Sequence, residues 1–331
     1  ERLQKHLTSY LLWDESFNPR IIPLIGDLSQ PLLGLSADKF AAIATQVDVI
    51  YHNGAFVNFT YPYSQLKAAN VLGTEEILRL AAQIKIKPVH FISTIGVVGA
   101  ADSTLDSIRE DTPIHRSENI SSGYTQSKWV AEKLVRIAGV RGIPISIYRP
   151  GRISGHSKTG VCNINDHTFR MIRGCIQLGS APKDNGIVNL TPVDYATQAI
   201  VYLSQQQTSF GKVFHLINPQ PLPWEEVVNS IISCGYPLKK IDYPQWCSQL
   251  LKEVEQYDDN PLYPLIAKVT NSESQNTSLE DSTTQQIDQQ NTLTGLAATT
   301  IVCPPLDSQL LSTYLSYLIN SGFLINPSNN N

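Results

Sequence analysis

A tyrosine and a lysine stand four residues apart in the stretch Ser121–Val135, at Tyr124 and Lys128. If this stretch is helical, both side chains lie on one face, about one turn apart. An ammonium group beside a phenol favours the phenolate, which lowers the tyrosine pKa and suits the side chain to proton transfer near neutral pH. Tyr-x-x-x-Lys alone is common by chance, so an ordinary amphipathic helix is the competing interpretation.

Two further polar residues are candidates for the same chemistry. Thr94 ends the expected strand Lys87–Thr94, where its hydroxyl can hydrogen-bond a substrate carbonyl oxygen that takes a proton from the tyrosine. Asn70 lies within a helical pattern, where its amide competes for the backbone, so it indicates a local kink or a function such as holding a water. Thr94 also has the simpler interpretation of a β-branched strand residue, and Asn70 that of a helix defect.

Strands and helices alternate over the part of the chain that contains these residues. The expected strands are Arg20–Ile25, Val47–His52, Lys87–Thr94 and Ile143–Arg149, and the expected helices are Ala37–Thr45, Tyr63–Gln83 and Ser121–Val135. This order predicts an α/β fold with a doubly wound parallel sheet. Right-handed crossovers bring the carboxyl ends of all strands to one edge, where such sheets bind ligands.

Several residues distant in the sequence are therefore expected to meet at that edge. They follow the strands directly, at Asp27 and Leu28, at Asn53, Gly54 and Ala55, at Ser93 and Thr94, and at Pro150 and Gly151. Small residues after a strand allow a ligand to approach the backbone closely. Asp27 also has a purely local interpretation, as the cap of the turn that follows it.

The alternation of strands and helices becomes less regular after Gly151. We expect residues 1–217 to form the core, residues 218–331 to form a smaller C-terminal substrate lobe, and residues 156–185 to contribute to that lobe. Residues 269–297 are rich in Asn, Gln, Ser and Thr, which predicts a disordered segment that does not join the core.

Composition narrows the classes of function. The 331 residues carry a formal net charge of −4 without Lys/Arg clusters, which argues against a nucleic-acid partner. No apolar run approaches the roughly 20 residues that span a bilayer, and no signal peptide is visible. The five cysteines have neither zinc-site nor CxxC spacing, so we expect no metal site and reduced thiols in a cytoplasmic protein.

Motifs in a fixed order resemble those of the extended short-chain dehydrogenase/reductase family. They are GDL (26–28), VIYHNGA (49–55), NVLGT (70–74), ISTIGVVG (92–99), GYTQSKWVAEKL (123–134) and YRPGRISGHSKTG (148–160). Together with LTPVDYATQAIVYLS (190–204), they look like the terminal thioester reductase domain of nonribosomal peptide synthetases and carboxylic acid reductases. The resemblance extends over about residues 1–260.

The resemblance implies roles for individual residues. Thr94, Tyr124 and Lys128 match the catalytic residues of the family, and Asn70 is often counted with them. The cofactor implied is NADPH, and the residues that would contact it are Asp27, Leu28, Asn53, Gly54, Ala55, Pro150, Gly151 and Ile153.

The same resemblance implies a reaction and a partner. An acyl or peptidyl thioester on the phosphopantetheine arm of a carrier protein would be reduced by NADPH and released as an aldehyde, or as an alcohol after a second reduction. Two alternatives stay open: a reductase of acyl-CoA or free carbonyl compounds, and a non-catalytic remnant that only docks a carrier protein.

One family feature is missing from this sequence. No GxxGxxG is present, so we expect a fold without the N-terminal βαβ unit whose glycine-rich turn holds the pyrophosphate. Such a chain would have an exposed sheet edge and is expected to bind NADPH poorly on its own.

Overall fold

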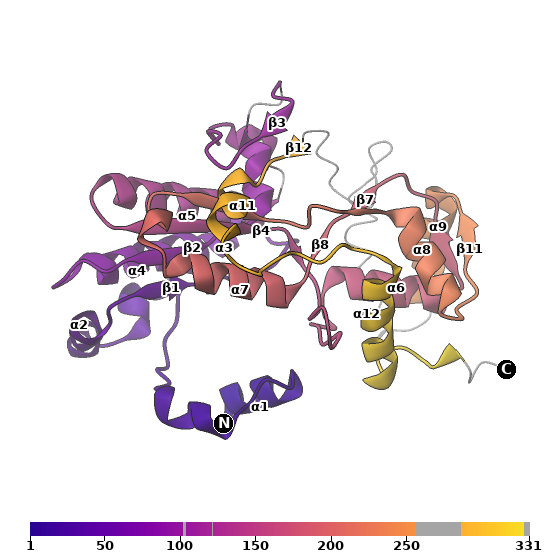
Figure 1. The fold of residues 1–331 in the computed structure, drawn as a ribbon, viewed down its shortest axis with the longest axis horizontal. Helices are drawn as coiled ribbons and strands as arrows, with labels where there is room; N and C mark the ends of the chain where they lie inside the picture. Colours follow the sequence, from indigo (N-terminus) through magenta and orange to yellow (C-terminus); the bar gives the residue numbers. More distant parts are fainter. Residues whose placement is uncertain (102–103, 121, 256–285, 328–331) are drawn as a thin grey trace.

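The protein is built around a parallel sheet of four strands. The computed structural model describes residues 1–101, 104–120, 122–255 and 286–327. The sheet has the order β1 (Ile50–His52), β2 (Val89–Ile92), β4 (Ile145–Pro150) and β9 (Val213–Leu216), with every pair parallel. The predicted α/β fold with a parallel sheet is confirmed (Figure 1).

Helices cover both faces of this sheet. On one face, α2 (Ala37–Gln46), α4 (Gly73–Ala82) and α5 (Gly123–Val140) enclose an apolar cluster with the strands. On the other face, α7 (Val193–Ser204) and α11 (Gln290–Leu296) pack on β4 and β9. Strand alternation explains the two clusters, because Ile147 belongs to the first and its neighbour Tyr148 to the second.

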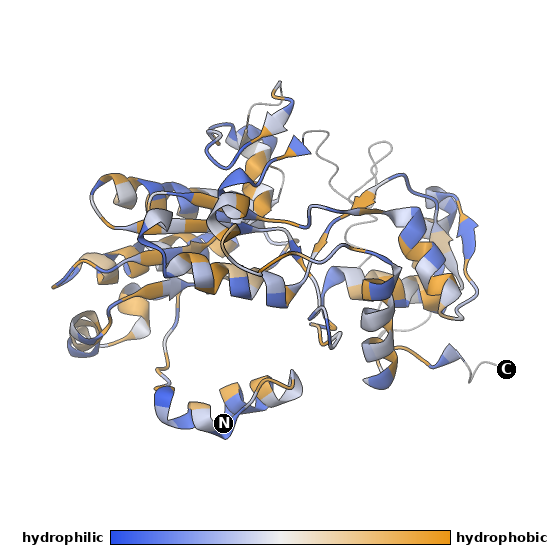
Figure 2. Ribbon diagram, in the orientation of Figure 1, coloured by the Kyte–Doolittle hydropathy of each residue, from blue (hydrophilic) through white to orange (hydrophobic). Residues whose placement is uncertain are grey.

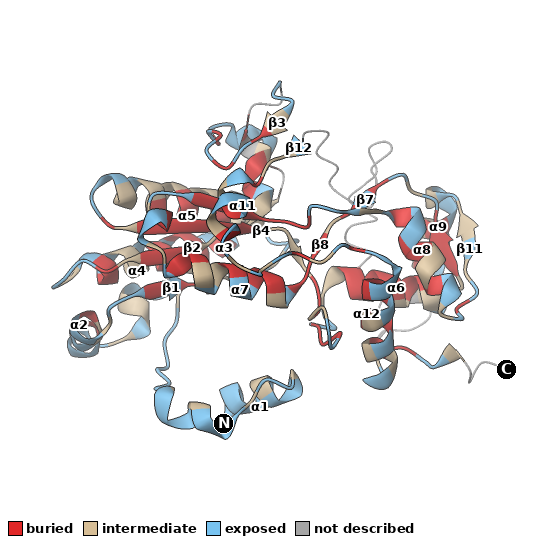
Figure 3. Ribbon diagram, in the orientation of Figure 1, coloured by how far each residue is buried: buried red, intermediate tan, exposed pale blue. Residues whose placement is uncertain are grey.

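A further apolar cluster lies at the far end of the molecule from α2 (Figures 1 and 3). It is formed by helices α6 (His167–Leu178), α8 (Trp224–Ser233), α9 (Tyr243–Glu255) and α12 (Ser308–Asn320), with strands β6 (Ser180–Pro182) and β11 (Lys239–Ile241). The hydropathy pattern agrees, since apolar segments gather along the sheet and inside this cluster (Figure 2). Two short ladders join β5 (Arg152–Ile153) to β8 (Leu190–Thr191), and β7 (Ile187–Val188) to β10 (Leu222–Pro223).

The predicted strand Arg20–Ile25 is wrong. Residues 21–27 have no assigned secondary structure, and the side chains of Ile22 and Ile25 are 92% and 95% exposed. A strand needs a partner, and within the described residues β1 ends the sheet order and pairs only with β2. The preceding helix α1 (Arg2–Ser9) has no buried residue, and it lies away from the sheet (Figures 1 and 3).

The disorder predicted for residues 269–297 is wrong for its last part, while residues 269–285 lie outside the described residues. Strand β12 (Gln286–Ile287) pairs with β3 (Ser107–Ile108), and α11 follows it. The buried carboxylate of Glu110 fixes this segment, because it accepts the backbone N–H groups of Asn291 and Thr292 as well as that of His215 in β9. The segment therefore packs on the sheet and not in the lobe that was expected to contain it.

This anchor generates a prediction about stability. Glu110→Gln replaces a carboxylate that accepts three backbone N–H groups with an amide, whose own NH₂ group would face one of these donors. The free energy of unfolding should therefore fall by about 2–4 kcal/mol. Urea unfolding measures the loss, and hydrogen exchange at Asn291 and Thr292 locates it. Asp111→Asn is the matched control, because its exposed ion pair with Arg109 contributes about 0–1 kcal/mol. Equal stability of the two variants would contradict the anchoring role.

Candidate functional site

Lys128 is enclosed at the junction of α5 and β2. Its ammonium group donates to the carbonyl oxygen of Ile92 at 2.7 Å, and the same nitrogen lies 4.2 Å from the centre of the Phe91 ring. Burial lowers the pKa of Lys128 to about 8, and the carboxylate of Glu132 one turn further along α5 opposes that shift. Among the described residues, Ile92 accepts one of the three ammonium protons of this lysine.

Tyr124 lies one turn before Lys128 on the same helix. Its ring makes an edge-to-face contact with Phe59, at 5.4 Å between centroids. The expected lowering of its pKa is wrong in this structure, since burial raises the pKa of Tyr124. The hydroxyl therefore stays protonated at neutral pH, as an acid must before it gives up its proton.

Thr94 approaches the first turn of α5 from the end of β2. It precedes the 3₁₀ turn Ile95–Ala100, and its hydroxyl oxygen accepts the N–H of Gly96 at 3.3 Å. A Cβ atom on Gly96 would lie 3.3 Å from the side chain of Thr125, so this turn packs against the residue that follows Tyr124 on α5. Thr94 and Lys128 are thus both placed at the carboxyl end of β2, and Tyr124 lies one turn before Lys128 on α5.

Asn70 lies in a π-helical turn and not in a continuous helix. The predicted helix Tyr63–Gln83 is divided into α3 (Tyr63–Lys67), the π-helical turn Ala68–Leu72 and α4. The side-chain amide exchanges hydrogen bonds with both backbone groups of Phe56, at 2.7 and 3.0 Å, and donates to Ser127 at 2.9 Å. The interpretation of Asn70 as a local helix defect is confirmed, because the helix is deformed there. The side chain fastens the loop after β1 to α5, and its role in the reaction stays a prediction.

The residues predicted to bind a cofactor lie at three places along the same edge. The side chain of Leu28 lies close to Gly54, which follows β1. A Cβ atom added to Gly54 would lie 2.8 Å from the Leu28 side chain. Asp27 makes only the local contacts of a turn cap, since its carboxylate accepts from Ser29. Asn53 and Gly54 are exposed, and Ala55 is partly so.

The third place is the end of β4. Gly151 follows Pro150 and donates its N–H to the carbonyl of Leu216 in β9 at 2.9 Å. Ile153 continues into β5 and pairs with Thr191.

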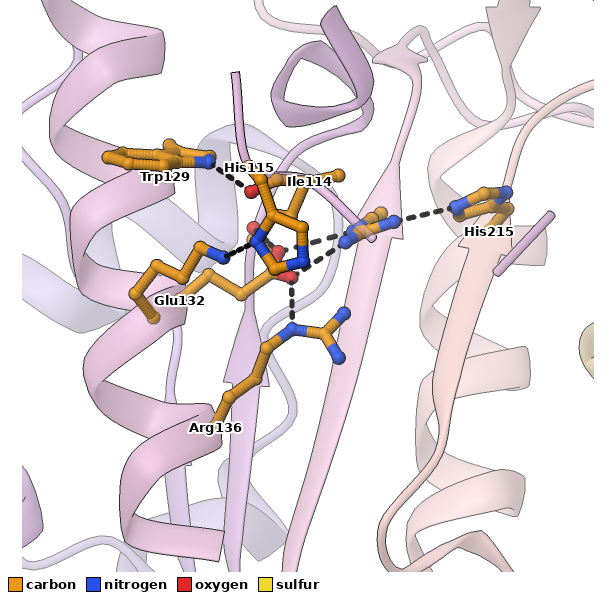
Figure 4. Close-up of polar contacts among 9 residues, drawn as sticks. Ile114, His115, Trp129, Glu132, Arg136 and His215 are labelled. Atoms are coloured by element: carbon orange, nitrogen blue, oxygen red, sulfur yellow. Dashed lines mark hydrogen bonds and ion pairs between the residues drawn. The ribbon is translucent and has the colours of Figure 1, made fainter. Parts of the chain in front are cut away.

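Sequence reasoning missed a buried polar network behind this edge. The carboxylate of Glu132 accepts hydrogen bonds from Ser93, Arg136 and Arg149, and Arg149 also donates to His215 (Figure 4). Figure 4 also shows the indole of Trp129 donating to the carbonyl of Ile114. The sequence spacing could have indicated this network, because Glu132 stands four residues after Lys128 and therefore lies on the same buried face of the helix.

Membrane-spanning helices and clusters of metal-ligating side chains are both absent from the described part of the chain. No helix there combines the length and apolarity that a bilayer requires. No three side chains of His, Cys, Asp or Glu are grouped as metal ligands within those residues.

A parallel sheet with a Tyr-x-x-x-Lys helix beside its carboxyl edge defines the extended short-chain dehydrogenase/reductase class. Residues 1–200 match the family described as Male sterility protein, and the chain belongs to this family. The family supports a nicotinamide cofactor for this chain.

Comparison with individual proteins places the chain among reductase domains. It is 44% identical to the solved terminal R domain from the myxalamid PKS-NRPS pathway, with a TM-score of 0.90, over 98% of this chain and 82% of that one. The reductase domain of a nonribosomal peptide synthetase from Mycobacterium tuberculosis is 25% identical over 98% of this chain and 82% of that chain, with a TM-score of 0.77.

Two curated relatives are much longer than this chain. One of the proteins that make up the linear gramicidin synthase of Brevibacillus parabrevis is 42% identical over 98% of this chain and 6% of its own length. The large subunit of the L-2-aminoadipate reductase of Candida glabrata is 34% identical over 99% of this chain and 25% of its own length. The chain thus spans a quarter or less of either protein.

The contacts of Asn70 generate a prediction. Asn70→Ala removes both hydrogen bonds to Phe56 and the one to Ser127, which should lower the free energy of unfolding by about 2–3 kcal/mol. The Phe56 amide should also lose its protection against hydrogen exchange. Asn320→Ala, at the exposed end of α12, is the control and should change neither quantity. Unchanged protection of Phe56 in Asn70→Ala would be inconsistent with the proposed fastening.

Proposed function

We propose that this protein is an NADPH-dependent reductase that releases a carrier-bound acyl or peptidyl thioester as an aldehyde. The observation that carries the proposal is the contact of Lys128, one turn after Tyr124 on α5, with the end of β2, which Thr94 follows directly. The 44% identity to the myxalamid terminal R domain supports the choice of a thioester as substrate. A structure of a thiolation-reductase di-domain among the similar proteins supports a carrier protein as partner.

The donors and acceptors along this edge fit a nicotinamide cofactor. Lys128 has ammonium protons to give to ribose hydroxyls, and the exposed backbone at Asn53 and Gly54 can be approached closely. Leu28 would contact the adenine, Asp27 would lie beside it, Ala55 would line the path of the cofactor, and Pro150, Gly151 and Ile153 would border the nicotinamide.

The reaction balances without a covalent enzyme intermediate. When bound, the cofactor would supply a hydride to the thioester carbon, and the balanced reaction would convert RCO–SR′, NADPH and H⁺ to RCHO, R′SH and NADP⁺. Thr94 and Tyr124 donate hydrogen bonds to the oxygen that gains negative charge, and Tyr124 then transfers its proton to it. The C–S bond breaks as the hydroxyl proton of the hemithioacetal passes to the departing sulfur, and the H⁺ of the overall reaction, taken from solvent, restores the Tyr124 phenol.

The side-chain pKa values suit this division of roles. Because burial raises the pKa of Tyr124, the phenol holds its proton until the substrate oxygen becomes strongly basic. Lys128 is mostly cationic at neutral pH and would stabilise the phenolate left after proton transfer.

The deciding experiment compares substrates on the full-length protein. An acyl thioester on a phosphopantetheinylated carrier protein should be reduced with loss of NADPH absorbance, and the matching acyl-CoA should react at least tenfold more slowly. NADH in place of NADPH is expected to support less turnover. Equal or faster reduction of acyl-CoA would overturn the carrier-bound substrate, and absence of turnover with every thioester and aldehyde would overturn the reductase.

Substitutions at the site give the corresponding prediction for the chemistry. Tyr124→Phe and Lys128→Met should each lower kcat by about 10²–10⁴-fold, because general acid catalysis contributes about that much. Thr94→Val removes one hydrogen bond to the oxyanion and should have a smaller effect. Tyr202→Phe on α7 is the control and should retain normal turnover. If Tyr124→Phe retained normal kcat, the phenol would not be the proton donor.

A further inference from the structure

A charged pair is enclosed behind the candidate site. The side chains of Glu132 and Arg149 are both 0% exposed, and the guanidinium donates to the two carboxylate oxygens at 2.7 and 3.2 Å. The Ser93 hydroxyl at 2.7 Å and the Arg136 side chain at 3.0 Å complete the contacts of the carboxylate (Figure 4). The remaining arm of the guanidinium lies 3.1 Å from a ring nitrogen of His215.

The protonation of this network follows from its partners. Arginine can only donate and a carbonyl can only accept, so His215 is neutral, with its proton on the nitrogen that faces the carbonyl of Asp288. Burial and the charge of Arg149 lower the pKa of His215 to about 4, in agreement. Arg149 holds the pKa of Glu132 at about 2 against the effect of burial. The pair is therefore ionised at any working pH.

Three members of the network, Ser93, Arg149 and Glu132, stand close in sequence to parts of the candidate site. Ser93 precedes Thr94 where the chain leaves β2, and Arg149 precedes Pro150 at the end of β4. Glu132 lies one turn after the candidate lysine on α5. The network thus joins the helix that carries the proposed acid to the ends of both strands that border the substrate.

Stability alone gives little reason for such a pair. The cost of removing two charges from water is large, and an apolar pair of similar size is often as stable. A bidentate guanidinium–carboxylate contact does fix distance and orientation, which apolar contacts do not.

We propose that Glu132 and Arg149 are positioning residues, which hold the Tyr124/Lys128 face of α5 in register with Thr94 and the end of β4. The proposal rests on the proposed function for its catalytic readout. Two contacts one turn apart set the register: Lys128 to the carbonyl of Ile92 and Glu132 to the hydroxyl of Ser93. Both side chains are fully buried, so neither is open to a substrate.

The network also has an electrostatic consequence. Among the described residues, the ionisable groups that interact with Lys128 are Glu132 on its own helix and His52 from β1. Burial lowers the pKa of His52 to about 3, so its imidazole is neutral. The residues that β2 presents to Lys128, Phe91 and Ile92, are not ionisable. The Glu132 carboxylate is therefore the one charge in this set that keeps the lysine cationic.

The test uses Glu132→Gln and Arg149→Lys in the full-length protein. Both should lower kcat by about 10–100-fold with less than a threefold change in KM for the thioester. Glu132→Gln should also move the alkaline limb of the pH–kcat profile downward by about one pH unit, because the lysine loses its neighbouring charge. Arg149→Lys retains the cation, so it should lower kcat without moving that limb. The matched control, Glu75→Gln on the exposed side of α4, should match the unsubstituted protein.

A purely structural role for Glu132 and Arg149 predicts different results. It would lower the melting temperature and the fraction of active molecules, while the surviving enzyme kept its normal pH profile and kcat per active site. That result would overturn the proposal.

The titration of Lys128, followed by NMR of ¹³C-labelled lysine, provides a readout that needs no turnover. If the unsubstituted protein is inactive on all thioesters, the proposed function fails, whereas an unchanged Lys128 titration in Glu132→Gln overturns the positioning inference independently.

Discussion

The hydrogen bond from the Lys128 ammonium to the carbonyl of Ile92 is the contact on which the site depends. Ile92 is the last residue of β2, so its carbonyl lies at the carboxyl end of that strand. An enclosed ammonium needs such an acceptor, because burial without a partner is costly. The helix that carries Tyr124 is thereby fixed relative to the loop that carries Thr94.

The π-helical turn at Asn70 has a similar effect on the other side of α5. A regular helix would satisfy its own backbone and leave the Asn70 amide without a defined orientation. In the wider π-helical turn, the Asn70 amide instead hydrogen-bonds to Phe56 and to Ser127, and Ser127 directly precedes Lys128 on α5. Strand β2 and the loop after β1 are thus both connected to α5 by buried polar contacts, although the three segments are far apart in the sequence. These contacts explain how a site built from separate segments keeps one geometry.

Sequence reasoning succeeded where the periodicity was strong and failed where partners decided the outcome. The strands around Ile50, Phe91 and Ile147 and the helix of Tyr124 were predictable, because their apolar spacing is imposed by burial against each other. Residues 20–25 have an equally good strand pattern, but a strand forms only where another strand pairs with it. The polar segment after residue 285 was misjudged for the opposite reason. Its order comes from Glu110, a residue about 180 positions earlier.

The same distinction explains the pKa values at the site. Spacing on a helix predicts that Lys128 lies one turn from Tyr124, but not how deeply each is buried. Burial raises the pKa of Tyr124 and lowers that of Lys128, so the phenol becomes the weaker acid of the two. A phenol that holds its proton and a lysine that titrates near pH 8 are suited to donating a proton once and then stabilising the phenolate. The sequence supplies the two side chains, and the packing of α5 against β2 sets their acidity.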